Sequence, residues 1–172
     1  MSAIYTDPGQ VPAGTSTSVA KVGGQIQFNT TNVGNISTGE DNLMGYAMPA
    51  DVLVTNGDYI EVEAWGQFAA NANAKTVKLY FGATTLINSG AVAINNGSWH
   101  FKATIIRTSA TAQKASAQIF GEGTLLAART SATTPAETLS GAITIKCTGE
   151  ATSNNDIVQN GLVVRWNPAG NS

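Results

Sequence analysis

DYIEVEAW, residues 58–65, decides the fold class, because small and branched apolar side chains recur at every second position from 60 to 64. Successive side chains of a β-strand point to opposite faces, so the alternation predicts a strand with one buried and one outward face. The side chains expected to be buried are Ile60, Val62 and Ala64. Those expected on the opposite face are Tyr59, Glu61, Glu63 and Trp65.

The same period continues along the chain. Residues 75–81 oppose Val77, Leu79 and Phe81 to polar neighbours. Seven further segments have the composition of strands. They are residues 24–28, 43–48, 85–88, 98–107, 113–120, 142–147 and 157–166.

Turn residues separate these segments. Asn56-Gly57, Asn96-Gly97 and Asn160-Gly161 accept positive φ and favour tight hairpins, and the third pair equally fits a bulge within a long strand. Pro49 cannot donate to a strand ladder and should end the strand before it.

No segment shows the helical period over a useful length, and residues 69–74 are expected to form a loop or one helical turn. Many short strands with long connections predict an all-β fold: a jelly-roll β-sandwich of about 8–10 antiparallel strands. We expect the sandwich to span residues 25–172.

Residues 1–24 carry Pro, Gly, Thr and Ser rather than strand patterns, which predicts an extended N-terminal arm. The arm is either a frayed tail or a segment that orders only against a partner. Under the second reading its partner-binding candidates are Tyr5, Pro8, Val11, Pro12, Val19 and Val22.

Composition excludes several classes of function. Charged residues make up 12% of the chain and the formal net charge is -2, so nucleic acid is not expected as a partner. No run approaches the ~20 apolar residues of a membrane span, so we expect no membrane insertion. The first residues lack the basic start and apolar run of a secretory signal. The single cysteine excludes an internal disulfide and a multi-thiolate metal site.

Catalytic groups are few. His100 is the one histidine available as a base, and it should lie opposite Trp99, Phe101 and Ile105 on its strand. Cys147 follows two isoleucines at alternate positions, so we interpret it as a buried hydrophobe rather than a partner of His100. No catalytic residue is therefore assigned, and the chain is not expected to be an enzyme.

Glu61 and Glu63 are the one carboxylate pair that could serve glycoside hydrolysis. The alternative is a solvated strand face on which they pair with Lys75, Lys78 or Lys102. The acidic stretches 38–42 and 153–156 lack the spacing of a calcium loop, so neither a metal nor a cofactor is expected.

The remaining candidates for binding are aromatic. They are Trp65, Tyr80, Trp99 and Trp166. Core packing is the default for tryptophan, whereas a solvent-facing cluster would indicate a sugar-stacking platform or a subunit interface.

Four stretches resemble small structural proteins of tailed phages. They are GEDNLMGYAMP at 39–49, NGDYIEVEAWG at 56–66, KTVKLYFG at 75–82 and the closing run from 148 to 166. The similarity spans residues 25–166 and leaves the arm out. It implies a jelly-roll module of the virion, commonly a homotrimer, that serves as a capsid decoration (cement) protein or as a tail-fibre or tail-tip module. It implies no catalytic residues.

A short arm rather than a fibre shaft favours the decoration role. The expected partner is then the major capsid protein, and the expected location is the outer surface of the capsid after synthesis in the host cytoplasm. The alternative is a receptor- or carbohydrate-binding module at a tail tip.

Overall fold

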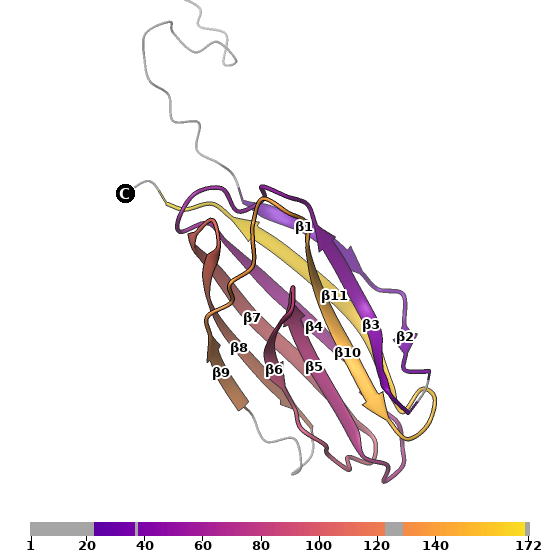
Figure 1. The fold of residues 1–172 in the computed structure, drawn as a ribbon. Helices are drawn as coiled ribbons and strands as arrows, with labels where there is room; N and C mark the ends of the chain where they lie inside the picture. Colours follow the sequence, from indigo (N-terminus) through magenta and orange to yellow (C-terminus); the bar gives the residue numbers. More distant parts are fainter. Residues whose placement is uncertain (1–22, 37, 123–128, 171–172) are drawn as a thin grey trace, which may run out of the picture.

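The computed structural model describes residues 23–36, 38–122 and 129–170, and this part of the chain forms eleven β-strands in two antiparallel sheets (Figure 1). The larger sheet has seven strands, in the order β1 (Gly24–Asn29), β11 (Ile157–Asn167), β4 (Tyr59–Phe68), β7 (Gly97–Ser109), β8 (Ala112–Gly121) and β9 (Arg129–Thr133), with β2 (Val33–Gly34) also paired to β11. The smaller sheet has the order β3 (Glu40–Met48), β10 (Ile143–Ala151), β5 (Lys75–Phe81) and β6 (Thr84–Asn88).

The chain passes repeatedly between the two sheets, which face each other across one core (Figure 1). β3 is followed by β4 in the other sheet, β4 by β5, β6 by β7, and β10 by β11. These crossings produce a jelly-roll β-sandwich rather than a simple meander. The predicted fold class is confirmed.

The core consists of the side chains that the alternating pattern turned inward. Ile60, Val62 and Ala64 on β4 are fully buried, as are Val77, Leu79 and Phe81 on β5. Cys147 is also fully buried, on the inner face of β10, and burial raises the pKa of its thiol to about 12. The predictions for these two strands and for the cysteine are confirmed.

The turn predictions have mixed outcomes. β3 ends at Met48, directly before Pro49, and a register shift between Gln159 and Gly161 shows that the Asn160-Gly161 pair forms a bulge. Asn96 and Gly57 do adopt positive φ, but the connections that contain them lead from one sheet to the other. The hairpin prediction was wrong for these two pairs, because the same backbone conformation also serves a crossing.

Two strands lie outside the predicted segments. β2 has only two residues, and β9 is a polar run without apolar alternation. Each is held by pairing to a longer neighbour, β11 and β8 respectively. Residues 69–74 form a loop without a helical turn, in agreement with one of the two alternatives.

A buried lysine joins the loops at one end of the sandwich. Lys75 is fully buried at the start of β5, and its Nζ lies 2.8–3.0 Å from four oxygens: the carbonyls of Asn71, Asn73 and Ile94 and the Oδ1 of Asn71. Asp156 accepts hydrogen bonds from the amides of Asn71 and Asn73 and supplies the opposite charge. Of the three lysines considered as partners for the carboxylates of β4, Lys75 is therefore not the one that pairs with them; Lys102 pairs with Glu63.

No helix among the described residues is long and apolar enough to cross a membrane. The predicted partner-binding residues of the arm fall within residues 1–22, outside the described part of the chain. The division into an arm and a sandwich at residue 24 remains a prediction.

Candidate functional site

The surface that gathers the most candidate residues is the solvent side of the seven-stranded sheet, which we call the outer face. Its side chains come from β1, β11, β4, β7 and β8, whose alternate positions point away from the core. The residues that define it are Phe28, Tyr59, Glu61, Glu63, Trp65, His100, Lys102, Thr104, Ile106, Ser116, Gln118, Phe120, Val163 and Arg165.

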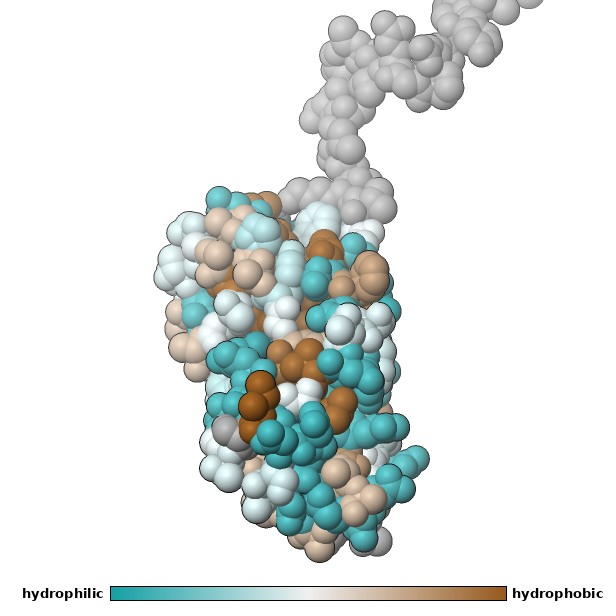
Figure 2. Space-filling view, turned by 90° about the vertical axis from the view of Figure 1, so that its right-hand side faces the viewer, coloured by the Kyte–Doolittle hydropathy of each residue, from teal (hydrophilic) through white to brown (hydrophobic). Residues whose placement is uncertain are grey.

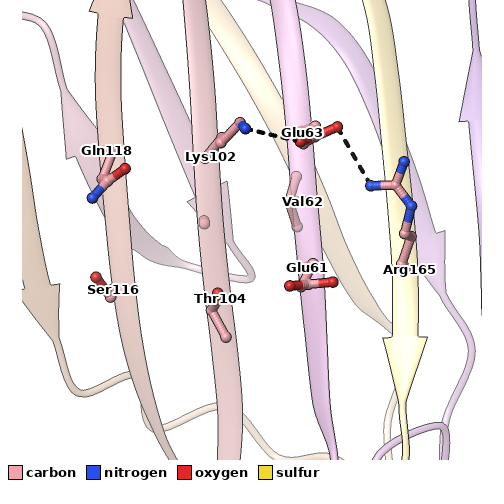
Figure 3. Close-up of a pocket in the computed structure, with 9 residues that line it drawn as sticks. Glu61, Val62, Glu63, Lys102, Thr104, Ser116, Gln118 and Arg165 are labelled. Carbon is pink, nitrogen blue, oxygen red and sulfur yellow. Dashed lines mark hydrogen bonds and ion pairs between the residues drawn. The ribbon is translucent and has the colours of Figure 1, made fainter. Parts of the chain in front are cut away.

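The centre of the outer face is charged (Figure 3). Glu63 stands on β4 between Lys102 of β7 and Arg165 of β11, and each cation lies 3.4 Å from a different oxygen of its carboxylate. Glu61, the next outward residue of β4, accepts a hydrogen bond of 3.3 Å from the Asn167 amide. The cross-strand register places Lys102 directly opposite Glu63, so strand pairing alone creates the first contact.

The charges of this centre stabilise one another. Partial burial alone would raise the pKa of the Glu63 carboxyl, but hydrogen bonding and attraction from Arg165 and Lys102 hold it below its ordinary value. Glu63 is therefore an ionised member of a three-charge group rather than a proton donor. Together with Thr104, Ser116 and Gln118 it lines an open depression of about 300 Å³.

An aromatic row crosses the outer face beside the charged centre. The ring centroids of Trp65 and His100 lie 6.3 Å apart, and those of His100 and Phe120 lie 4.6 Å apart, both edge to face. The Trp65 indole lies over Gly161, where an added Cβ would stand 2.1 Å from the Cζ2 atom of Trp65. The glycine at the β11 bulge thus makes room for the indole to lie flat on the sheet.

His100 is enclosed within this row. Its Nε2 atom is buried and has no hydrogen-bond partner among the described residues. Burial lowers the pKa of the imidazole, the nearby Lys102 charge acts in the same direction, and Glu63 opposes them. At neutral pH the ring is an uncharged packing element between two aromatic side chains.

Large apolar side chains also emerge on the outer face. Among the described residues five are exposed, and three of these belong to the outer face: Phe28 (63% exposed), Ile106 (39%) and Phe120 (36%). The other two, Ile36 (73%) and Val54 (45%), lie elsewhere. Antiparallel sheets usually turn polar residues to water, so these three side chains make the outer face the candidate contact surface of the sandwich.

The two residues of the hypothetical thiol dyad do not meet. His100 lies on the outer face of one sheet, opposite the buried Trp99, Phe101 and Ile105 as predicted, whereas Cys147 lies on the inner face of the other sheet. Glu61 and Glu63 share one strand face beside Lys102, as the non-catalytic interpretation expects. The absence of enzyme activity remains a prediction.

The acidic stretches considered for a cation are occupied by protein contacts. Glu40 accepts hydrogen bonds from Lys78, Tyr80 and Thr148. Partial burial would raise the pKa of its carboxyl, but these contacts lower it to about 2. Asp156 serves the loop around Lys75 and also accepts the backbone N–H of Ser153 at 2.9 Å. Among the described residues no three His, Cys, Asp or Glu side chains form a cluster able to hold a metal.

The four aromatic candidates do not form one cluster. Trp99 is buried in the core, Trp166 packs partly buried against it, and Tyr80 lies on the outer side of the smaller sheet near Lys146. Only Trp65 joins the row on the outer face. Phe120 and Ile106 each follow a buried isoleucine, so the alternation on β8 and β7 could have predicted their outward direction. Phe28 could not be predicted in this way, because a register shift after Gln25 turns it outward although Ile26 packs against the core.

A second, smaller apolar feature lies beside the first described residues. Ile26, Asp51, Val52, Val54 and Trp166 surround an open depression of about 390 Å³. Gly23 lies next to Trp166, since an added Cβ there would stand 2.7 Å from the Trp166 carbonyl oxygen. The edge that contains β1, β2 and β3 also shows apolar surface ringed by hydrophilic residues (Figure 2).

Comparisons with known proteins add little. No family model matches the chain, and no curated protein matches it. One similar solved structure is the VP2 subviral particle of infectious bursal disease virus, with 13% identity and a TM-score of 0.27. The match covers 96% of this chain and 46% of that one, so the chain spans less than half of its length. A similarity of this size carries no conclusion about function.

Proposed function

We propose that this chain is a structural protein of a phage particle, and specifically a decoration protein that binds the outer surface of the assembled capsid. The resemblance of residues 25–166 to small tailed-phage proteins supports the virion role. The outer face, where exposed apolar side chains surround a charged centre on a regular sheet, supports a protein that works in an assembly.

A binding surface of this kind needs no conformational change to meet its partner. The sheet fixes the backbone, and the aromatic row is packed edge to face. Rigid side chains lose little conformational entropy when a partner covers them, which favours association. The proposed partner is the major capsid protein, met by a homotrimer.

The proposed action is thermodynamic. A protein that binds the assembled shell and not its separated subunits stabilises the shell by mass action. Three linked copies attach more firmly than one, because the second and third contacts form at high effective concentration. No nucleic acid, membrane or cofactor takes part.

The arm is the proposed capsid contact. Its candidate residues remain Tyr5, Pro8, Val11, Pro12, Val19 and Val22. The apolar depression around Trp166 lies where the described chain begins, so a partner bound to the arm would also meet exposed apolar surface there.

Binding to heads that lack this protein tests the proposal. The full chain should sediment with such heads and raise the temperature at which they release their contents. A chain without residues 2–22, which leaves β1 whole, should show reduced occupancy. Gold-labelled antibody on intact particles should mark the head. Label confined to the tail, or no change in head stability at saturating occupancy, would refute the decoration role.

The second candidate is a carbohydrate-binding module at a tail tip. The observation in its favour is the aromatic row beside a depression lined by Glu61, Glu63, Lys102 and Arg165, because sugars stack on aromatic rings and bond to charged side chains. Specific binding to a glycan array, lost in Trp65→Ala, would favour this function over decoration.

A further inference from the structure

The two solvent-facing sides of the sandwich differ in a way that the fold does not require. On the smaller sheet the outward positions carry Lys78, Lys146, Glu150, the half-buried Tyr80 and small polar residues, and none of the described residues there is an exposed large hydrophobic side chain. The outer face of the larger sheet carries three. The asymmetry indicates that, of these two sheet faces, the outer face of the larger sheet is the one that a contact covers.

We propose that the outer face is the contact between copies of this chain, in which three copies turn it toward a shared three-fold axis. The inference rests on the trimer of the proposed function but does not depend on its place in a virion. The surfaces that meet would be the aromatic row, the charged centre and the exposed side chains of Phe28, Ile106 and Phe120.

The balance of charge favours a second copy as the occupant. Glu61 and Glu63 oppose Lys102 and Arg165 on this face, so the formal charges of the centre cancel. A face directed at a strongly acidic or basic partner would carry an excess of the opposite sign. The whole face carries both signs, with Lys114 of β8 as one further cation, so the carboxylates of one copy can lie near the cations of the next.

The size of the face fits a stable association. Strands lie about 4.8 Å apart and rise about 3.3 Å per residue, so β11, β4, β7 and β8 together cover about 700 Å², and β1 brings the total to about 800 Å². Specific interfaces of standard size bury about 800 Å² on each partner. The depression at the centre is much smaller than this area, and a sugar would leave the exposed phenylalanines and Ile106 uncovered.

The aromatic row provides the expected energetic centre of such a contact. Interface energy concentrates in well-packed aromatic side chains near the middle of the contact, surrounded by residues that exclude water. Trp65 is already fixed against Gly161, and His100 is fixed between Trp65 and Phe120. Covering this row costs little side-chain entropy because its members are ordered in the single chain.

Native mass of the full chain tests the inference. The wild-type protein should have three times the chain mass at micromolar concentration. The variant Phe28→Lys with Phe120→Lys should associate about 100-fold more weakly, because two apolar contacts become buried charges. The double variant Phe28→Ser with Phe120→Ser is a milder change, to be used if the two lysines unfold the chain. Near-ultraviolet circular dichroism checks the fold of both double variants.

Ile36→Lys is the matched control, since Ile36 is the most exposed large hydrophobic residue of the described chain and lies outside the outer face. It should leave the mass unchanged.

A wild-type monomer, or an oligomer that survives both face variants, would overturn the inference. A wild-type monomer whose glycan binding is lost in the face variants would replace it with the sugar platform. A dimer that the face variants dissociate would uphold the contact and overturn the three-fold arrangement. Failure to bind heads would leave the contact standing and refute only the decoration role.

Discussion

Replacing Lys75 by methionine should destabilise the protein strongly, although the new side chain has similar length and greater hydrophobicity. The Lys75 Nζ satisfies three backbone carbonyls and one amide oxygen, drawn from residues 71, 73 and 94. Methionine cannot donate to any of them. The Asp156 carboxylate, which faces this ammonium through Asn71 and Asn73, also loses its counter-charge.

The expected magnitude follows from these contacts. Each buried acceptor left without a partner costs about 1–3 kcal/mol, and removing one member of a buried charge pair costs about 3–5 kcal/mol. Part of the cost of the unpaired acceptors is recovered, because the variant has no ammonium to keep out of water and because water can enter the loop. We therefore expect the free energy of unfolding to fall by about 3–5 kcal/mol. For a chain of this size the melting temperature should fall by roughly 6–20 °C.

Urea and thermal unfolding, followed by circular dichroism, measure the effect. Lys78→Met is the matched control, because Lys78 pairs with Glu40, a partly exposed carboxylate that water can reach, and its loss should cost clearly less than that of Lys75. If Lys75→Met unfolds at the same urea concentration as the wild type, Lys75 does not join the loops in the way described.

Three further predictions concern the outer face, the smaller sheet and the core. Gly161→Val should lower stability by about 1–3 kcal/mol and shift Trp65 fluorescence, because the new side chain occupies the place of the indole; Gly24→Val, with open space at its Cβ, should do neither. Glu40 has a pKa lowered to about 2 in the folded chain, so its contribution to stability is complete above its ordinary value of 4.5 and is lost as the pH falls toward 2. Acid titration of stability should therefore be flatter in Glu40→Gln across that range, and parallel curves would contradict the assignment. The thiol of Cys147 should resist an aromatic disulfide reagent at pH 8 in the folded protein and react completely in urea, and rapid labelling of the folded chain would show that the thiol is accessible.

The sequence predicted the strands whose two faces differ in polarity. Residues 58–65 and 75–81 alternate without interruption, and their apolar positions form the core. It could not predict β2 and β9, because their residues carry no alternation and they pair only where a longer strand offers a free edge. It also could not predict that Lys75 is buried, since one of its four acceptors is the carbonyl of Ile94, nineteen residues away.

The candidate site was predictable only in part. The outward direction of Glu61, Glu63 and Trp65 follows from the alternation on one strand. The aromatic row depends instead on register, which pairs Trp65 with His100 and His100 with Phe120 across three strands. Register is fixed by the whole sheet, so no single segment of sequence contains it.

Hydroxyl-radical footprinting of the wild-type chain tests most directly whether the outer face is a contact surface. It is carried out at chain concentrations above and below the dissociation constant of the oligomer. Phe28, Ile106 and Phe120 should be oxidised several-fold more slowly in the concentrated sample, whereas Ile36 should react equally in both. Equal oxidation of all four side chains at both concentrations would contradict the account.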